Sequence, residues 1–541
     1  MSMAGNSFRS MEQDVDTRFA EVYQAIVSRN PEHDFAPSLE RVQRVMEFLG
    51  DPQKSFRIVT VTGTNGKTST ARMIEALVRA YGLRTGLFTS PHLTNITERI
   101  TVDGEPITKE KFIEVYDDVA PYIEMVDTES QAAGGPRLSF FEVLTVMAFA
   151  AFADAPVDVA VVEVGMGGEW DATNVADADV SVITPIGLDH QEWLGDTIAA
   201  IAATKAGIIK PKGVLVRSVQ EPLAADILDE RAAEVGARVV RENQEAFVVD
   251  RQMAVGGQVV TLQTPGAVYA DIFLPLHGKH QAHNALLALA AVEQLLGGGA
   301  AGAASSGTGA KALASEPVSE GFMSVTSPGR LELLRDSPPI LVDVAHNPHG
   351  AEALSDAVAE TFGFSNLVLV FAAMADKDVE GILAALAENA EAIVLTRNSS
   401  PRCADPEDIA PIARQIFGDD NVYVEPKLNE AIAQAVDLAE EADPTGMGTG
   451  AGVLITGSVV TVGDAKLLLG RGPSTASASA PPNASERLAN LRDSDFRSVL
   501  DGESPAVATL DDDYDADGDF DDDPDALLGW DAGFDDENGE E

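Results

Sequence analysis

The sequence predicts an α/β protein with two successive domains, each built on a mainly parallel sheet. The prediction rests on short apolar strands that alternate with helical segments in two series, one from about residue 56 and one from about residue 339. Strands joined by helices form parallel sheets that are covered on both faces. The second series is the shorter one, and we expect it to form a smaller Rossmann-like domain.

Residues 1–50 are expected to be mainly helical, because LERVQRVMEFLG places apolar side chains at helical spacing and ends in a glycine. The first strand is FRIVTV, and a helix follows it from Lys67. Two more strands are predicted over residues 157–165 and 179–187, and the segment TIAAIAATKAGI after them has a helical pattern.

The second series contains five predicted strands, at residues 339–345, 366–372, 391–396, 421–425 and 452–457. Helical runs such as EALSDAVAETF and NEAIAQAVDLAEE fall between them. The first of these strands is not followed by the G-x-G-x-x-G pattern of dinucleotide sites, so a dinucleotide cofactor is not indicated.

The composition argues against several classes of protein. A single cysteine among 541 residues rules out a disulfide framework, and the start of the chain lacks the basic and apolar regions of a signal peptide. No apolar run is long enough to span a bilayer, so we expect a cytoplasmic protein without membrane contact. The formal charge of −50 disfavours binding to nucleic acid, which requires a basic face.

The segment VTVTGTNGKTSTAR carries the first functional motif. The usual phosphate-binding loop has four residues between its glycines, whereas two separate Gly63 from Gly66. A strand still leads into the turn, and the helix after it directs its positive N-terminus toward a bound anion. Lys67 can contact the phosphates, and Thr68 or Ser69 can offer Mg²⁺ a hydroxyl. An ordinary strand–helix turn, the alternative, would not need a lysine followed by two hydroxyls.

Glu163 is the second candidate, because a carboxylate at the end of the apolar strand VDVAVVE is costly unless it is paired or bound to a metal. The carboxyl ends of parallel strands are also where such sheets present their ligands. His190 follows the next predicted strand, where a histidine taken by itself is more often structural than a ligand. The pattern around Lys205 by itself indicates only a surface residue of a helix.

The chain also resembles a known family. GTNGKTST is similar to the compact loop of the Mur ligases and folylpolyglutamate synthases, ATP-dependent ligases that join an amino acid to a carboxylate. Further segments follow the order seen in bacterial folylpolyglutamate synthase/dihydrofolate synthases, most closely the actinobacterial bifunctional ones: TSPHLTNITERI, SFFE, VVEVGMGGEWDATNV, GLDHQEWLG, KAGIIK, HGKHQAHNALLAL, SPGRLE, DVAHNPHG and TGSVVTVG. The resemblance covers about residues 35–472. A Mur ligase would carry a UDP-binding domain before its phosphate loop, and the 62 residues before Gly63 are too few for one.

The resemblance implies a Mur-ligase-like domain arrangement. We expect an N-terminal extension at residues 1–34, then a P-loop ATP-binding and catalytic domain at residues 35–323 with a flexible Gly/Ala/Ser loop at residues 297–321. A Rossmann-like C-terminal ligase domain would follow at residues 324–472. Residues 473–541 are rich in Ser, Ala and Pro and then mostly acidic, so we expect a disordered tail.

The resemblance also implies a reaction. ATP would phosphorylate a carboxylate to an acyl phosphate, and the amine of L-glutamate would displace the phosphate. The acceptors would be folates and also 7,8-dihydropteroate, and two Mg²⁺ ions with a carbamylated Lys205 would bring ATP and the carboxylate together. All implied partners are small molecules, and we expect a monomer. The alternative is a non-catalytic or weakly active nucleotide-binding protein of the same fold.

Family positions carry over to individual residues of this chain. The metal positions are Ser90, Glu163, His190 and Lys205. The catalytic positions are Lys67, Lys205 and His346. The ATP-binding positions are Gly63, Thr64, Asn65, Gly66, Lys67, Thr68, Ser69, Asn284, Arg330 and Asp343. The expected pterin contacts, for which core packing is an equal alternative at the two phenylalanines, are Ser139, Phe140, Phe141 and Trp170.

Three residues depart from the family pattern. Glu169 stands where the family usually has arginine after the paired glycines, a charge reversal beside the expected metal site. Thr204 replaces the usual glutamate before Lys205, and Val344 replaces a glycine.

In the acidic tail, DYDADGDFD matches the first half of a calcium loop, but Pro524 stands where the bidentate glutamate belongs, so we expect solvated chain there.

Overall fold

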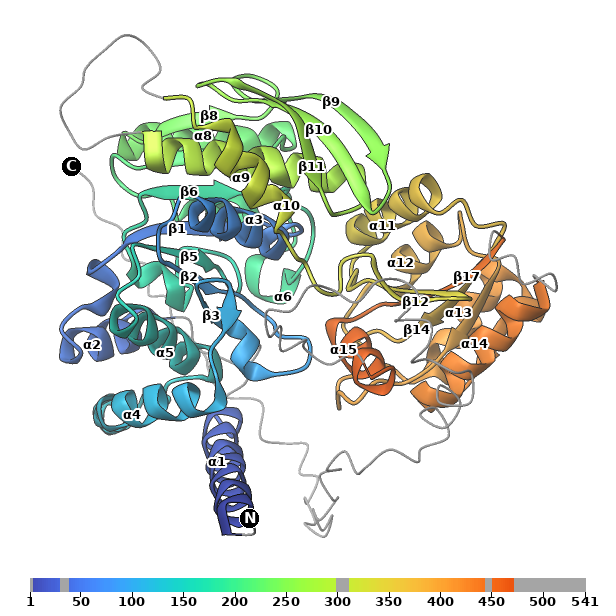
Figure 1. Ribbon diagram of the computed structural model, residues 1–541, viewed down its shortest axis with the longest axis horizontal. Helices are drawn as coiled ribbons and strands as arrows, with labels where there is room; N and C mark the ends of the chain where they lie inside the picture. The colour runs from blue at the N-terminus through green and yellow to red at the C-terminus, as the bar shows by residue number, and fades with distance from the viewer. Residues whose placement is uncertain (1–2, 30–37, 298–310, 443–449, 471–541) are drawn as a thin grey trace, which may run out of the picture.

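The computed structural model describes residues 3–29, 38–297, 311–442 and 450–470. These residues form two α/β lobes, one from α1 to α10 and the other from β12 to α15 (Figure 1). The predicted fold class is confirmed, since each lobe is built on its own mainly parallel sheet. The predicted tail at residues 473–541 and the calcium-loop match in it lie outside the described residues.

The first lobe is built on an eight-stranded sheet in the order β4-β3-β2-β5-β1-β6-β7-β8. Strand β1 lies inside the sheet and pairs in parallel with β5 and β6, as expected for an apolar run that is buried on both faces. Strands β3 and β4 at one edge run antiparallel. The strands are β1 (Arg57–Thr62), β2 (Thr85–Phe88), β3 (Ile100–Val102), β4 (Glu105–Pro106), β5 (Val159–Glu163), β6 (Val180–Ile183), β7 (Val214–Arg217) and β8 (Arg238–Arg241).

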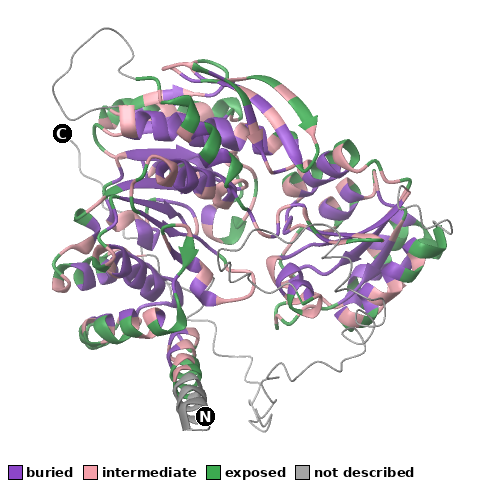
Figure 2. Ribbon diagram, in the orientation of Figure 1, coloured by how far each residue is buried: buried purple, intermediate pink, exposed green. Residues whose placement is uncertain are grey.

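Helices cover both faces of this sheet. Val159 and Val161 of β5 join the core under α3 and α9, whereas Ala160 and Val162 join the core under α4 and α5, which is the alternation of a strand buried on both sides. Figure 2 shows the inner strands of the parallel sheets in both lobes as buried, whereas the edge strands are partly exposed. The helices are α1 (Met3–Val27), α2 (Glu40–Phe48), α3 (Lys67–Ala80), α4 (Lys109–Ala132), α5 (Phe140–Asp154), α6 (Gln191–Leu194), α7 (Ile198–Ala206), α8 (Pro222–Val235), α9 (Lys279–Gly297) and α10 (Ser315–Met323).

Two features of the first lobe differ from the sequence prediction. The strands β9 (Phe247–Ala254), β10 (Gly257–Gln263) and β11 (Val268–Leu274) form a separate antiparallel sheet that the alternating pattern did not reveal. The predicted flexible loop at residues 297–321 is wrong over its last part, because helix α10 begins at Ser315. Its Phe322 is fully buried against α3, and this packing outweighs a composition that resembles a linker.

The second lobe contains a six-stranded sheet in the order β12-β13-β17-β14-β15-β16. All five predicted strands are present, and β12 adds an antiparallel edge. In the described ranges, no helix combines the length and apolarity that crossing a membrane requires. The elements are β12 (Glu332–Asp336), β13 (Pro339–Val342), α11 (Pro348–Thr361), β14 (Asn366–Phe371), α12 (Val379–Leu386), β15 (Ala392–Leu395), α13 (Pro406–Phe417), β16 (Val422–Val424), α14 (Leu428–Ala442), β17 (Ala451–Thr456) and α15 (Val459–Leu468).

The packing of α10 gives a stability prediction. Phe322→Ala should lower the free energy of unfolding of the first lobe by about 3–5 kcal/mol, because it removes a fully buried ring beside α3. Met323→Ala is the matched control, because the side chain of Met323, next to Phe322 in the chain, is 62% exposed. This substitution should lower the free energy of unfolding by less than about 0.5 kcal/mol. Urea denaturation followed by tryptophan fluorescence measures both values. Equal, small losses would show that α10 is not part of the core.

Candidate active site

A cavity of about 1430 Å³ lies between the two lobes and is lined by residues of both. The first lobe contributes the loops after β1, β2, β5 and β6, at the carboxyl edge of its sheet. The second lobe contributes the loops after β13, β14 and β17, at the carboxyl edge of its own sheet. Both sheets therefore direct their ligand-binding edges into one cleft.

The phosphate loop after β1 is packed so closely that its two glycines are required. Gly63 has φ of +148°, and a Cβ there would lie 1.9 Å from the hydroxyl of Thr184. Gly66 has φ of +84°, and a Cβ there would lie 2.6 Å from Oδ1 of Asn284. Helix α3 begins at the next residue, so its N-terminus opens directly on the cleft.

Two lysines converge on the carbonyl of Gly63. Nζ of Lys67 donates to this oxygen at 3.1 Å and to the carbonyl of Thr64 at 2.9 Å. Nζ of Lys205, in α7, donates to the same Gly63 oxygen at 2.9 Å. Lys205 lies beneath the loop and is not among the residues that line the cleft. Burial, and then the charge of Lys67, lower the pKa of Lys205 to about 7.

Glu163 lies at the end of β5 and is buried. Its Oε1 accepts a hydrogen bond from the hydroxyl of Thr68 at 2.9 Å, and its Oε2 accepts one from the backbone N–H of Ser90 at 3.2 Å. Burial raises the pKa of this carboxyl, while the charge of Lys67 acts in the opposite direction. The hydroxyl of Ser69 is directed instead to Ser327, at 3.1 Å, so Thr68 is the hydroxyl that the loop presents to the carboxylate.

This environment of Glu163 fits a hard divalent cation. In the part of the chain that the structure describes, no lysine, arginine or histidine lies within 4.0 Å of the carboxylate, and a buried anion without such a partner is costly. Of the predicted metal positions, the structure brings Ser90 to Glu163 but not His190 or Lys205. The ring of His190 lies beside Asp189, with Nε2 3.9 Å from Oδ2. Among the described residues, no three His, Cys, Asp or Glu side chains form a ready metal site.

Three further predicted ATP-binding residues, Asn284, Arg330 and Asp343, also line the cleft. Arg330 lines the cleft without an ion pair among the described residues, and burial lowers the pKa of its guanidinium, although the nearby Asp343 acts in the opposite direction. Asp343 also lines the cleft, and burial raises its pKa. Asn284, near the start of α9, lies against Gly66 and donates to Gln281 at 3.1 Å.

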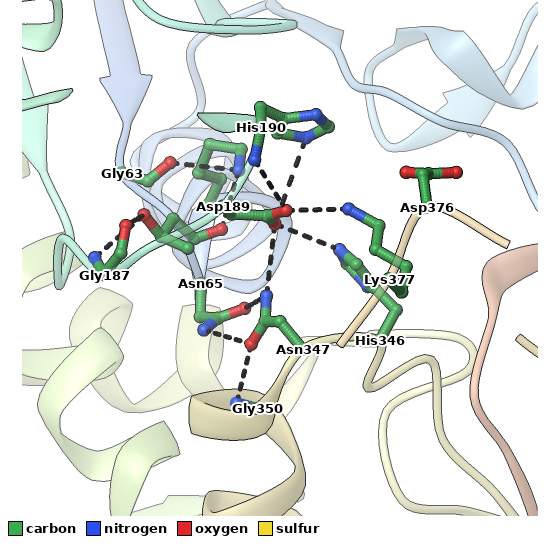
Figure 3. A network of polar contacts seen from close by, with 12 residues as sticks. Gly63, Asn65, Gly187, Asp189, His190, His346, Asn347, Gly350, Asp376 and Lys377 are labelled. Carbon is green, nitrogen blue, oxygen red and sulfur yellow. Dashed lines mark hydrogen bonds and ion pairs between the residues drawn. The ribbon is translucent and has the colours of Figure 1, made fainter. Parts of the chain in front are cut away.

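Asp189, in the loop after β6, joins the two lobes (Figure 3). Its Oδ1 accepts from Nζ of Lys377 at 2.7 Å, and its Oδ2 accepts from Nδ2 of Asn347 at 3.2 Å and lies 3.6 Å from Nε2 of His346. Burial alone would raise the pKa of Asp189, but the contacts with His346, His190 and Lys377 lower it below the usual range.

Sequence reasoning assigned no role to Asp189, Asn347 or Lys377. The first two lie inside GLDHQEWLG and DVAHNPHG, segments that already carried the family resemblance, and their polar side chains directly after strands were a usable signal. Lys377 lies in the loop after β14 and outside the quoted motifs, so the sequence gave it no such marker.

The predicted pterin contacts divide into two groups. Phe141 and Trp170 line the cleft with Met166 and Trp193, which gives an apolar and aromatic wall, and Ser139 lines it while capping α5. Phe140 is not a lining residue. It packs inward, with the guanidinium of Arg99 over its ring at 5.0 Å from the centroid.

Glu169 does not face Glu163. Its side chain is exposed and does not line the cleft, and its backbone N–H bonds the carbonyl of Thr204 at 2.9 Å. The charge reversal at this position therefore lies outside the cleft between the lobes.

A phosphate loop that faces a second α/β domain across a cleft suits an enzyme that brings ATP together with a second substrate, as two-domain ATP-dependent ligases do. Two family models match the chain, the Mur ligase middle domain over residues 61–292 and the Mur ligase, glutamate ligase domain, over residues 329–459. The dihydrofolate synthase/folylpolyglutamate synthase of Mycobacterium tuberculosis is 50% identical over 459 residues, which cover 82% of this chain and 92% of the relative. The chain therefore belongs to the Mur ligase family and, within it, to the dihydrofolate synthase/folylpolyglutamate synthases.

Solved structures agree with this assignment. Mycobacterium tuberculosis folylpolyglutamate synthase complexed with ADP has a TM-score of 0.79 and 48% identity, over 85% of this chain and 100% of that one. A folylpolyglutamate synthase complex with AMPPCP and folate has a TM-score of 0.69 and 29% identity, over 83% of this chain and 99% of that one.

The contact between Thr68 and Glu163 gives a prediction about Mg²⁺. Thr68→Val should lower turnover at least about tenfold and raise the Mg²⁺ concentration needed for half-maximal rate, because it removes a hydrogen bond to the buried carboxylate. Thr70→Val is the matched control on the same helix, since its buried hydroxyl has no hydrogen-bond partner. Steady-state kinetics over a Mg²⁺ titration compare the two variants. An equal Mg²⁺ dependence of the two variants would mean that Thr68 has no role in binding Mg²⁺.

Proposed function

We propose that this chain joins L-glutamate to the carboxylate of folates, and also to that of 7,8-dihydropteroate, at the expense of ATP. The observation that carries the proposal is the interlobe cleft, in which Lys67 lies near Arg330, Lys377 and the buried Glu163. A carboxylate and a triphosphate repel each other, so an acyl-phosphate route needs cations at the point where they meet. The solved relative bound to AMPPCP and folate supports these substrates.

In the first step, a carboxylate oxygen of the acceptor bonds to the γ-phosphorus of ATP while the bond to the β–γ bridging oxygen breaks. ADP leaves, and the acceptor becomes an acyl phosphate. The loop from Gly63 to Lys67 and the N-terminus of α3 would hold the phosphates. Lys67 and Arg330 would stabilise the negative charge that moves toward ADP.

In the second step, the amine of L-glutamate bonds to the acyl carbon, phosphate leaves, and the amine loses a proton. His346 is our candidate to accept this proton. Its Nδ1 donates to the carbonyl of Val344 at 2.9 Å, which leaves Nε2 on the side of Asp189 and the cleft. The carboxylate of Asp189 would then stabilise the imidazolium that forms.

Glu163 and the hydroxyl of Thr68, with Ser90, whose backbone N–H contacts Glu163, would hold one Mg²⁺, which when bound screens the charge of the phosphates. A second ion would need a carbamylated Lys205 together with His190. The burial of Lys205 supports this modification, because the neutral amine is the form that reacts with CO₂.

Phe141 and Trp170 would contact the flat pterin ring. We place this activity in the cytoplasm, in a monomer whose domains follow the boundaries predicted from sequence.

The proposal is tested with the full chain, ATP, Mg²⁺ and L-glutamate, with tetrahydrofolate or 7,8-dihydropteroate as acceptor. We expect phosphate release that depends on both the acceptor and glutamate, and a product heavier by one glutamyl residue in mass spectrometry. Lys67→Ala should lower turnover at least about a hundredfold, because it removes a cation from the phosphates. Nucleotide binding without turnover in the unmodified chain would favour the non-catalytic alternative.

The lowered pKa of Lys205 gives a pH prediction. With a pKa of about 7, the amine is mostly neutral at about pH 8 and mostly protonated at about pH 6, whereas an ordinary lysine is protonated at both. In ¹³C-bicarbonate, a carbamate signal in the ¹³C NMR spectrum should be present at pH 8 and lost as the pH falls through 7. Lys205→Arg keeps a cation and should lack the signal. A signal that persists in this variant would place the modification elsewhere.

A further inference from the structure

Asp189 belongs to the first lobe, but its side chain is held mainly by the second. Lys377, Asn347 and His346 approach its two carboxylate oxygens from the loops after β14 and β13 (Figure 3). Asp189 and Lys377 are both largely buried, with side chains that are 9% and 11% exposed. This ion pair therefore joins the two lobes inside the cleft.

Asn347 links Asp189 to Asn65 of the phosphate loop. Its amide and that of Asn65 exchange two hydrogen bonds of 3.1 Å, and its Oδ1 also accepts from the backbone N–H of Gly350, at the start of α11. On the first-lobe side, Thr64 and Gly187 exchange two hydrogen bonds of 3.0 Å, which tie the phosphate loop to the segment that carries Asp189. The phosphate loop, the Asp189 loop and the second lobe thus form one continuous polar network.

The charge of Asp189 makes a direct role in holding ATP unfavourable. A carboxylate beside a phosphate loop repels a triphosphate, and it would also repel the carboxylates of glutamate. Its favourable contribution must come through the groups that it holds, which are the ammonium of Lys377, the amide of Asn347 and the ring of His346. Removing one member of a buried ion pair leaves an uncompensated charge and is strongly unfavourable.

Other ion pairs between the lobes are more exposed. Arg251 pairs with Glu360, and Lys279 pairs with Asp356. The side chains of the second pair are 61% and 53% exposed, and such pairs contribute little because water screens them. Among the lysine and arginine ion pairs that the described residues form between the lobes, the Asp189–Lys377 pair is therefore the most deeply buried.

We propose that Asp189 is a positioning residue, which docks the second lobe onto the phosphate loop and thereby holds Lys377 at the transfer site. Most of the predicted nucleotide contacts, from Gly63 to Ser69 and at Asn284, belong to the first lobe. We therefore expect nucleotide binding to depend much less on this contact than the use of L-glutamate does. The kinetic part of this inference rests on the proposed ligase function, and the docking part does not.

The kinetic test uses Asp189→Asn in the full chain, with Lys377→Met and the double variant to complete a cycle. We expect the KM for L-glutamate to rise at least about tenfold in Asp189→Asn while the Kd for ADP, measured by calorimetry, stays within about twofold. The effects of Asp189→Asn and Lys377→Met on the KM for L-glutamate should be strongly non-additive in the double variant. Asp189→Glu keeps the charge and should recover part of the loss. Glu360→Gln is the control, because the side chains of its interlobe pair with Arg251 are 34% and 18% exposed, more than those of Asp189 and Lys377, and it should leave both constants within about twofold.

Docking itself is measured by the distance between spin labels at Glu230→Cys and Glu407→Cys, exposed positions on α8 and α13, in a Cys403→Ser background. With ADP, Asp189→Asn should broaden this distance distribution, and Glu360→Gln should not. Thermal unfolding identifies any variant that fails to fold. If Asp189→Asn does not fold, Asp189→Glu is compared with the unmodified chain instead. An unchanged distribution, or a Kd for ADP that rises as much as the KM for glutamate, would overturn the proposal. Absence of turnover in the unmodified chain would refute the proposed function, and the spin-label result would still decide on docking.

Discussion

The site depends on the close packing of the phosphate loop between β6 and α9. Thr184 leaves no room for a Cβ at Gly63, and Asn284 leaves none at Gly66. The hydroxyl of Thr184 also donates to the carbonyl of Asn65 at 2.6 Å, which fixes the middle of the loop. With the backbone fixed in this way, the carbonyl of Gly63 can accept from two lysines, and α3 starts with its N-terminus in the cleft.

The two carboxylates near this loop, those of Glu163 and Asp189, lie in different environments. Glu163 is buried against a hydroxyl and a backbone N–H without a cationic partner among the described residues, so burial raises its pKa. Asp189 is also largely buried but faces Lys377 and His346, and its pKa is lowered. The first environment suits a metal ion and the second suits an ion pair between lobes. In our proposals, the two carboxylates near this loop therefore have different roles, Glu163 in ligand binding and Asp189 in docking the lobes.

Much of the fold and part of the site were accessible from the sequence because they depend on local patterns. Apolar runs and the glycine–lysine–hydroxyl motif predicted β1, α3 and the phosphate loop, and the isolated carboxylate drew attention to Glu163. The sheet β9–β11 and helix α10 were missed, because their residues show neither a clear alternation nor a strong helical pattern. Phe140 and Phe141 are adjacent and chemically identical, and packing alone directs one inward and the other to the cleft.

The sequence by itself determined the two α/β series, the phosphate loop and the family to which the chain belongs, since each is encoded in contiguous residues. The tertiary structure decided that Thr68 and not Ser69 faces Glu163, that Lys205 is buried beneath the loop, and that Glu169 is turned away from the cleft. It also revealed the contact of Asp189 with Lys377, two residues 188 positions apart in the chain. Such contacts depend on how the two lobes meet, and no local pattern carries that information.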